Sequence, residues 1–355
     1  MTKIEKLIAK HCPDGVEYLP LGELVDICKG AQLNRDSLSE EGAYPVINGG
    51  INPSGFWDEF NFEKDLITVS QGGASAGYVN WIPTRFWAGA HCFVLMNPKK
   101  EVLYRYVYFV VKAAERDLMQ SQIGAGIPSV SVAKLASVEV PVPPIPVQEE
   151  VVRMLDGMTG LVDALENELN ARQLQYEHYR RKVMGAVKEK KGLDEVCVIK
   201  NGSDYKAFGE GKYPVYGSGG IMTYVDHYAY DKPTVLIPRK GSIENFFYVD
   251  TPFWNVDTIF YTEIDTKVME PKFLYQAMQT VDVQHLNNAG GVPSLTQTGL
   301  YTLKIPCPSL SVQKKIVKQL DAFERLCNST TEGLPGEIAA RRQQYEYYRE
   351  KLLSF

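Results

Sequence analysis

The chain has 355 residues, 45% of them hydrophobic and 23% charged, which is typical of a soluble globular protein with room for two domains. It has no apolar run of about eighteen residues, and its N-terminus, MTKIEKLIAKHC, has no apolar core, so we expect neither a membrane span nor a secretory signal. The net charge of −5 argues mildly against a general DNA-binding protein, because such proteins usually neutralise phosphates with a basic surface. A protein working inside a larger complex needs only local basic clusters, so charge alone does not decide.

The first part of the chain is rich in Gly, Pro, Tyr and β-forming residues, and this pattern predicts short strands separated by turns. The apolar runs within 65–73 and 86–97 are the clearest strands, and 103–120 is the best candidate for a helix. A proline-punctuated strand follows over 136–150, where proline stiffens the connection and stops the strand. A long helix is then expected from Val147 to Met184, about 57 Å at 1.5 Å per residue, enough to hold two domains well apart.

The second part repeats this order, with strands expected in 234–242 and 258–264, a helix in 271–281 and a proline-punctuated strand over 301–315. Two long stretches carry the similarity. ARQLQYEHYRRKVM of 171–184 and ARRQQYEYYREKLL of 340–353 share eight of fourteen positions, and 126–156 and 291–321 share eleven of thirty-one. Two shorter segments also occur in both halves: Tyr-Pro-Val with a following Gly-Gly, and a Phe-Trp pair. A series in the same order in both halves indicates a tandem repeat.

The predicted helices carry apolar residues at heptad spacing, which indicates a coiled-coil seam. In the first helix this seam is interrupted by Arg172, and in the second by four extra residues around Gly-Leu-Pro-Gly, where the helix should break or kink. Two matching seams in one chain favour antiparallel pairing with each other, although each helix could instead pack on its own domain. The seam positions are Leu155, Met158, Val162, Leu165, Leu169, Tyr176, Tyr179, Leu320, Phe323, Ile338, Tyr345 and Tyr348.

These patterns predict an α+β fold of two β-rich domains, each followed by a long helix, with the two helices pairing as an antiparallel coiled coil in a pseudo-twofold tandem repeat. We expect four segments: a first β-rich domain at 1–146, a central helix at 147–186, a second β-rich domain at 187–308 and a C-terminal helix at 309–355.

Two β-rich domains, each followed by a P-x-P-x-x-x-x-Q junction and an ARR-x-QYEYYR-type helix, resemble the specificity subunits of type I restriction–modification enzymes. The opening HCPDGVEYLPLGEL is also similar to the usual start of that family. The resemblance covers essentially the whole chain, and the helical motifs are its specific part. The Gly-Leu-Pro-Gly interruption and the short length depart from the family pattern.

The resemblance implies that each β-rich domain is a target recognition domain reading one part of a split double-stranded DNA sequence. It implies that the paired helices set the gap and dock modification subunits, two of them, which bind S-adenosylmethionine and methylate adenine. A restriction subunit can join and cleave DNA with ATP. The chain itself would be a non-catalytic cytoplasmic subunit.

Candidate DNA-contacting residues lie in predicted loops, since Arg and Lys suit guanine or phosphate and Asn and Gln suit adenine. An ordinary β-turn is the competing interpretation for each loop. The shared Gly-x-Pro-Ser segments at 126–129 and 291–294 favour a structural or phosphate-binding turn, because a shared element cannot distinguish two half-sites. The candidates are Lys29, Gln32, Asn34, Arg35, Gln71, Gly72, Gly73, Ser75, Gln120, Gln122, Lys206, Arg239, Lys240, Ser242, Asn287 and Asn288.

No nucleotide-binding, methyltransferase or metalloprotease motif and no catalytic triad pattern is present, so neither a catalytic residue nor a cofactor is expected. The six cysteines form no C-x-x-C pair and have no histidine at zinc-ligand spacing, which indicates reduced thiols and no metal site. Two other functions stay open: an assembly scaffold whose β-rich domains bind protein or glycan, and an enzyme with a diverged site. A repeat that keeps its helices and changes its β-rich part fits a DNA reader better than either.

Overall fold

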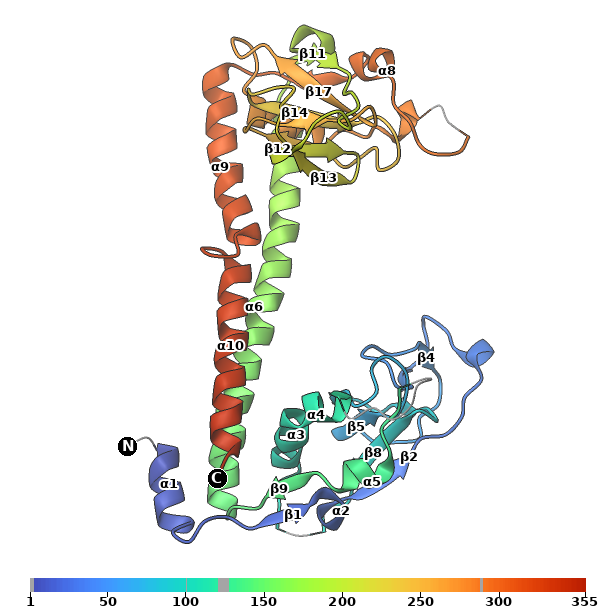
Figure 1. Cartoon of the computed structure of the whole chain (residues 1–355), viewed down its shortest axis with the longest axis vertical. Coiled ribbons are helices and arrows are strands. Elements are labelled where there is room, and N and C mark those ends of the chain that lie inside the picture. The colour runs from blue at the N-terminus through green and yellow to red at the C-terminus, as the bar shows by residue number, and fades with distance from the viewer. Residues whose placement is uncertain (1–2, 100, 121–127, 288–289) are drawn as a thin grey trace. The chain divides into compact units, whose positions relative to one another are not determined.

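The computed structural model describes residues 3–99, 101–120, 128–287 and 290–355. The chain forms two compact units: residues 1–164 with 338–355, and residues 165–337. The long helix α6 (Ile145–Ala186) contributes its first part to one unit and its second part to the other. Figure 1 labels the elements along the chain. Along the described ranges, no helix is long and apolar enough to span a membrane.

The first unit is built on a four-stranded antiparallel sheet and a smaller three-stranded sheet. The larger has the order β2-β8-β5-β6 and the smaller β4-β3-β7, in which β3 and β7 run parallel. Their strands are β2 (Asp26–Lys29), β3 (Tyr44–Ile47), β4 (Phe56–Trp57), β5 (Leu66–Ser70), β6 (Val79–Ile82), β7 (Trp87–Ala88) and β8 (Cys92–Met96). A two-stranded ribbon joins β1 (Tyr18–Pro20) to β9 (Glu139–Pro141). The helical elements are α1 (Lys3–His11), α2 (Leu21–Leu24), η1 (Arg35–Ser37), α3 (Tyr104–Ala113), α4 (Glu115–Gln120) and α5 (Val132–Ala136).

The second unit repeats this topology strand for strand. Its larger sheet has the order β11-β17-β14-β15, and its smaller sheet has the order β13-β12-β16 with β12 and β16 parallel. The strands are β11 (Cys197–Lys200), β12 (Glu210–Gly217), β13 (Gly220–Val225), β14 (Thr234–Pro238), β15 (Phe247–Val249), β16 (Trp254–Asn255) and β17 (Ile259–Ile264). The ribbon is β10 (Lys190–Gly192) with β18 (Lys304–Pro306). The helical elements are η2 (Leu193–Glu195), α7 (Pro271–Met278), η3 (Gln284–Leu286), α8 (Gln297–Tyr301) and α9 (Leu310–Asn328). The tandem repeat expected from the sequence is therefore confirmed.

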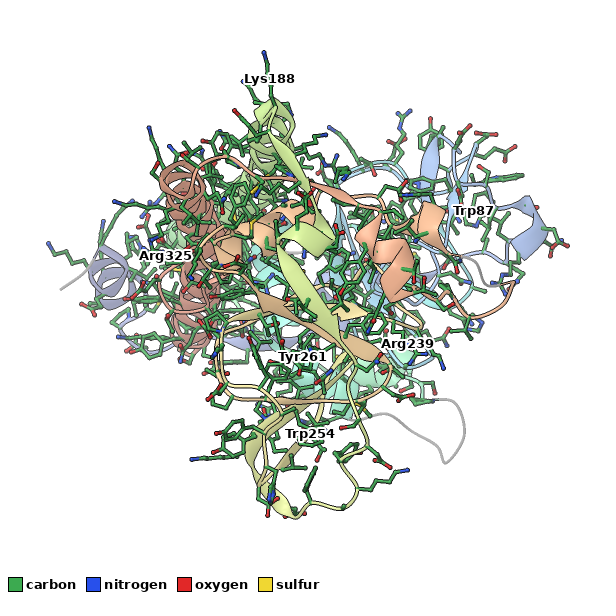
Figure 2. The ribbon with its side chains drawn as sticks, turned by 90° about the horizontal axis from the view of Figure 1, so that it is seen from above. Trp87, Lys188, Arg239, Trp254, Tyr261 and Arg325 are labelled. Carbon is green, nitrogen blue, oxygen red and sulfur yellow. The ribbon has the colours of Figure 1, made fainter. Side chains whose placement is uncertain are left out.

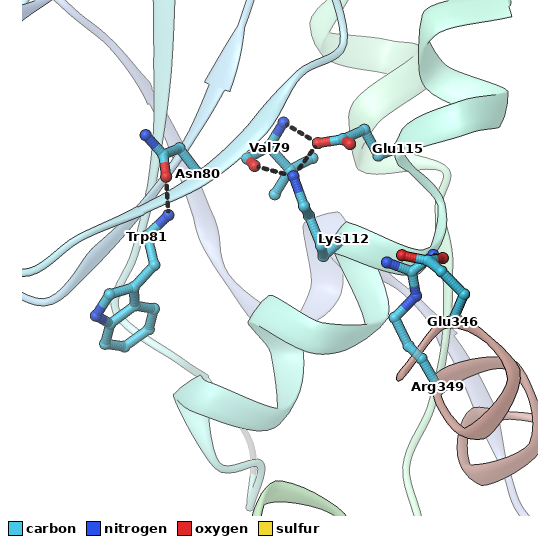
Figure 3. A network of polar contacts seen from close by, with 7 residues as sticks. All are labelled: Val79, Asn80, Trp81, Lys112, Glu115, Glu346 and Arg349. Atoms are coloured by element: carbon cyan, nitrogen blue, oxygen red, sulfur yellow. Dashed lines mark hydrogen bonds and ion pairs between the residues drawn. The ribbon is translucent and has the colours of Figure 1, made fainter. Parts of the chain in front are cut away.

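The edge strand β6 of the first unit is clamped by the helices beside it. Glu115 accepts hydrogen bonds from the backbone N–H of Val79 at 2.7 Å and from Lys112 at 2.5 Å, and Lys112 also donates to the Val79 carbonyl at 2.8 Å (Figure 3). These contacts satisfy the main-chain groups that an edge strand would otherwise leave unpaired. The predicted helix over 103–120 is divided here, because α3 ends at Ala113 and α4 begins at Glu115.

The proline-rich junction before each long helix is held by one buried glutamine. Gln148 accepts from the Leu103 N–H at 2.8 Å and donates to the Pro143 carbonyl at 2.7 Å. Gln313 does the same in the second unit, accepting from the Glu270 N–H at 2.8 Å and donating to the Pro308 carbonyl at 2.7 Å. Both side chains are fully buried. The glutamine of the P-x-P-x-x-x-x-Q motif thus joins the long helix to the helix of the β-rich domain.

Contacts between α6 and α9 in the second unit show that the long helices pair in an antiparallel arrangement. The Tyr176 ring stacks on Phe323 with 6.2 Å between centroids, and the Tyr179 hydroxyl donates to Gln319 at 2.8 Å. From the first contact to the second, the residue number rises on α6 and falls on α9, so the two helices run in opposite directions. In the first unit, Leu155 of α6 lies in the same core as Leu352 of α10 (Leu334–Leu353). The coiled-coil expectation is therefore confirmed.

Arg172 does not interrupt the seam as an unpaired charge. Its guanidinium donates to Glu168 at 2.7 Å and to Gln175 at 2.8 Å, both on the same helix. Its side chain is 41% exposed, so the charge stays hydrated.

The predicted interruption of the C-terminal helix is a complete break. Helix α9 ends at Asn328, and α10 begins at Leu334 with Pro335 in its first turn, where a missing N–H costs little. A Cβ on Gly333 would lie 2.5 Å from the Arg325 carbonyl oxygen, so no other residue fits this turn without movement. The break expected around Gly-Leu-Pro-Gly thus divides the C-terminal helical segment into α9 and α10.

Replacing Gln148 or Gln313 by Met should lower the free energy of unfolding by about 2–4 kcal/mol, because each change leaves buried backbone groups without partners. Urea unfolding followed by circular dichroism measures this. Glu149→Met, one residue along and exposed, is the control and should change stability by less than about 0.5 kcal/mol. Equal stability of Gln148→Met and Glu149→Met would show that the junction does not depend on this side chain.

Candidate nucleic-acid interface

The loop that follows the central strand of each larger sheet has the same backbone frame in both units. In the first unit, Gln71 donates its N–H to the His91 carbonyl at 2.8 Å and accepts from the Val130 N–H at 2.8 Å. In the second unit, the Arg239 N–H donates to the Thr258 carbonyl at 2.8 Å, and the Arg239 carbonyl accepts from Leu295 at 2.8 Å. Gln71 and Arg239 are therefore structurally equivalent.

The Pro-Ser part of each Gly-x-Pro-Ser segment holds this loop. The Gly73 N–H donates to the Pro128 carbonyl at 3.0 Å, and the Gly241 N–H donates to Pro293 at 2.9 Å. Both glycines have positive φ, +89° and +83°, a conformation that side chains disfavour. The Gly-Ile that opens the first segment lies outside the described residues. The described part of this shared segment positions the backbone in both units.

The side chains carried on this common frame differ between the units. Gln71 and Gly72 of the first unit correspond to Arg239 and Lys240 of the second, since Gly72 pairs with Ser129 as Lys240 pairs with Ser294. The Arg239 guanidinium lies 5.8 Å from the Phe260 ring, and one of its nitrogens is 3.5 Å from the Asp257 carbonyl. The Arg239 side chain stays partly exposed beside these two contacts.

Polar groups from three segments surround Arg239 in a hollow of about 310 Å³. They come from the end of β11, from the loop after β14 and from the start of α8, while Phe260 and Leu295 supply apolar lining. Figure 2 labels Arg239 within the side chains of this unit. The polar lining residues are Asn201, Arg239, Lys240, Ser294, Thr296 and Gln297. The sequence predicts Arg239 and Lys240 as DNA contacts but gives no signal for Gln297 beyond its position.

A second candidate loop follows the first strand of each larger sheet and is fastened by a tryptophan. The Trp87 indole N–H donates to the Ala31 carbonyl at 3.2 Å, and Trp254 donates to Ser203 at 2.9 Å. Glycine is required at Gly30, where a Cβ would lie 2.2 Å from a carbonyl oxygen. This anchoring leaves four candidate side chains exposed on the two loops: Gln32, Asn34, Arg35 and Lys206.

A hairpin tip that sequence reasoning did not select lies against the Arg239 loop. Ser218, between β12 and β13, accepts at its carbonyl from the Asn245 side chain at 3.2 Å, and its hydroxyl would lie 3.5 Å from a Cβ on Gly241. In the first unit, a Cβ on Gly49 would lie 3.2 Å from the Gly72 carbonyl. The repeated Tyr-Pro-Val with Gly-Gly was the available signal for this hairpin. It indicated the repeat but not the position.

The remaining candidates lie in different structural settings. The Asn287 side chain accepts from the Ser294 N–H at 3.1 Å, so it positions the Pro-Ser segment. Lys29 and Gln120 are exposed, at the ends of β2 and α4, and Ser75 accepts from the Tyr78 N–H in the turn after Gly73. Ser242 is exposed beside Lys240. Two candidates, Gln122 and Asn288, lie outside the described residues.

The described residues offer little for catalysis by a thiol or a metal. Burial raises the pKa of the Cys92 and Cys197 thiols to about 12, which keeps them protonated and unreactive. All six cysteines are free. Among the described residues, no group of three His, Cys, Asp or Glu side chains is placed to hold a metal ion.

Comparison with known proteins gives a consistent result. The family model described as "Type I restriction modification DNA specificity domain" matches residues 13–172 and again 187–340. A putative type I restriction enzyme specificity subunit of Haemophilus influenzae is 29% identical over all of this chain and 98% of its own length. The EcoR124I/EcoR124II specificity subunit of Escherichia coli is 26% identical over all of this chain and 97% of its own length.

Solved structures show the same fold. The S subunit of a type I restriction–modification system from M. genitalium superposes with a TM-score of 0.63 at 22% identity, covering 96% of this chain and 97% of that one. A chain from a study of complex assembly and conformational transition in the type I R-M system gives a TM-score of 0.61 at 13% identity, covering 96% and 98%.

Substituting Gly73 tests the backbone frame of the loop. Because no described atom lies within 4 Å of a Cβ built there, any loss of stability comes from the positive φ rather than from a clash. We expect Gly73→Val to lower the free energy of unfolding by about 1–2 kcal/mol more than Gly73→Asn, since asparagine tolerates this conformation and β-branched residues do not. Urea unfolding of the two variants measures the difference. Equal effects would mean that the loop adopts another conformation.

Proposed function

The chain belongs to the type I restriction–modification DNA specificity family, and from this premise we propose that its two units read the two parts of a split DNA sequence through the loops after β5 and β14. Catalysis lies in other subunits of the family's enzymes, and this chain supplies recognition. The observation that carries the proposal is the shared loop frame with different side chains: Gln71 and Gly72 in one unit, Arg239 and Lys240 in the other.

The chemistry of these side chains suits different bases. A glutamine amide can bond to both N6 and N7 of adenine, whereas arginine can bond to O6 and N7 of guanine. A common backbone presenting different side chains reads two unlike half-sites, which a pair of identical loops cannot do. We assign the loops around Gln32 and Lys206 to phosphate and flanking contacts, because phosphate contacts set position rather than sequence.

The net charge of −5 indicates that the chain does not hold DNA alone. We propose that two modification subunits dock on the paired helices and supply much of the phosphate neutralisation, and that restriction subunits can join this complex. The family's adenine methylation and ATP-dependent cleavage then occur around the chain. Free cysteines are consistent with work in the reducing cytoplasm.

We further propose that recognition domains at 1–146 and 187–308 alternate with helical segments at 147–186 and 309–355. Matching glutamine junctions at Gln148 and Gln313 support this division, since each marks the passage from a β-rich domain to its helix.

Arg239→Ala and Lys240→Ala should each weaken DNA binding by the complex with its modification subunit. Loss of a base contact would cost roughly 1–3 kcal/mol and change preference at one position, whereas loss of a phosphate contact would weaken all sequences and lower the salt dependence. Fluorescence anisotropy with labelled duplexes at several salt concentrations separates these effects.

Lys232→Ala is the matched control, because Lys232 is an exposed lysine just before β14 whereas Arg239 lies just after it. Unchanged affinity and salt dependence in Arg239→Ala and Lys240→Ala would refute this loop assignment.

A fragment of residues 1–188 should dimerise, because it keeps the seam of α6 and loses the helices that cover it. In the dimer, residues 165–184 of each copy would replace α10 against the other copy. The two readers are then identical and inverted, so the methylated sequence should be an interrupted palindrome. Light scattering gives the mass, and methylation mapping with the modification subunit gives the sequence. A monomer, or an asymmetric methylated site, would show that the two halves are not equivalent.

A further inference from the structure

The β12–β13 hairpin of the second unit presents apolar side chains to solvent. Ile221, Met222 and Tyr224 of β13 are 50%, 58% and 50% exposed, and β13 lies at the edge of its sheet. A single exposed apolar residue is ordinary on a protein surface, but three within four positions form a patch. Such a patch indicates a contact surface, and its position relative to the Arg239 loop indicates what it contacts.

Met222 and Ile221 lie on opposite faces of this hairpin. A Cβ on Gly217 would lie 2.7 Å from the Met222 sulfur and 3.6 Å from a methyl carbon of Val256, so Met222 lies over Gly217 on the Val256 face. Ile221 pairs across the hairpin with Tyr216, and paired residues share a face. Because Tyr216 and Gly217 are consecutive in β12, they face opposite ways. The two exposed neighbours are therefore available to different surroundings.

The Val256 face of the hairpin is continuous with the Arg239 loop. Val256 is followed by Asp257, whose carbonyl oxygen lies 3.5 Å from the Arg239 guanidinium. The tip of the hairpin also packs on this loop, because the Ser218 carbonyl accepts from the Asn245 side chain at 3.2 Å. The exposed methionine thus lies beside the segment that holds the proposed base-reading arginine.

The first unit has a polar group at the corresponding place. Gly89 and Val256 are equivalent, because their N–H groups donate to the carbonyls just before Asn48 and Gly217, at 2.8 Å and 3.0 Å. A Cβ on Gly89 would lie 2.2 Å from the Asn48 side-chain oxygen, so glycine makes room for the amide there. The second unit has Val256 instead, and its Gly217 is covered by Met222. The surface beside the loop is polar in one unit and apolar in the other, as expected of positions that distinguish two half-sites.

We propose that Met222 specifies a thymine by contacting its 5-methyl group in the major groove, beside the base pair read by Arg239. This inference rests on the proposed function, because it requires that the second unit reads DNA. Arginine recognises guanine in the major groove, and the thymine methyl group projects into the same groove. The methionine thioether is flexible and polarizable, which suits contact with a methyl group. Met222 is thus a second specificity-determining residue of this unit, and the first unit, with Asn48, lacks the contact.

The test uses the full chain in complex with its modification subunit, and duplexes that contain the methylated sequence. Each thymine of that sequence is replaced in turn by uracil, which pairs with adenine in the same way and lacks only the 5-methyl group. Fluorescence anisotropy should show that one replacement weakens binding by the wild-type complex roughly fourfold, the effect of burying one methyl group. Met222→Ala should weaken binding to the thymine duplex by a similar factor and should bind the two duplexes equally.

Ile221→Ala is the matched control, because Ile221 is the neighbouring residue, is similarly exposed and lies on the opposite face. It should keep the full sensitivity to uracil. Both side chains are exposed, so folding should be unaffected, and circular dichroism checks this.

Four results would overturn the contact. The methylated sequence could contain no thymine, no uracil duplex could bind more weakly, Met222→Ala could keep the sensitivity, or Ile221→Ala could lose it too. Loss of the uracil effect in Met222→Ala alone supports the contact even where Arg239→Ala binds normally. Normal binding by Arg239→Ala would then count against the loop assignment and leave this contact standing.

Discussion

A helix that follows one repeat in the sequence completes the core of the unit that holds the other repeat. In the second unit, Tyr176 of α6 packs on Phe323 and donates to Gln276 of α7 at 3.1 Å. In the first unit, the equivalent Tyr345 of α10 packs against the core that contains α3. Each tyrosine has the arginine four residues later beside its ring, Arg180 at 5.1 Å and Arg349 at 5.4 Å. The QYExYR motif is repeated because it makes the same contact twice.

This exchange of helices explains why the framework is conserved between the repeats while the loops are not. Four residues of the framework appear in both copies because each makes one specific structural contact. They are the tyrosine and arginine of the motif, the buried glutamine of the junction and the glycine after the central strand. At Gln71 and Arg239 the shared hydrogen bonds are made by backbone groups, so the side chains can differ while the loop frame is kept. Such a protein can change the DNA sequence that it recognises without changing how its helices and domains assemble.

The sequence was sufficient for the architecture because the signals there are periodic or repeated. Heptad spacing indicated that the long helices pair, and the duplication indicated two β-rich parts. Extra residues around Gly333 indicated the break in the last helix, although not its completeness, since that depends on carbonyl oxygens of α9 that crowd Gly333. The interface was only partly predictable. Arg239 and Lys240 lie in an obvious loop, whereas Gln297 lies beside them through a helix placement that spacing does not reveal.

The proposed function requires that two different recognition domains read the two parts of one DNA site, and mapping of methylated adenines tests this requirement. Genomic DNA from cells producing the full chain with its modification subunit would be sequenced by a method that detects the modified base. The account predicts methylation within one interrupted sequence whose two specific parts differ from each other. Methylation at a continuous sequence, or without sequence preference, would contradict it.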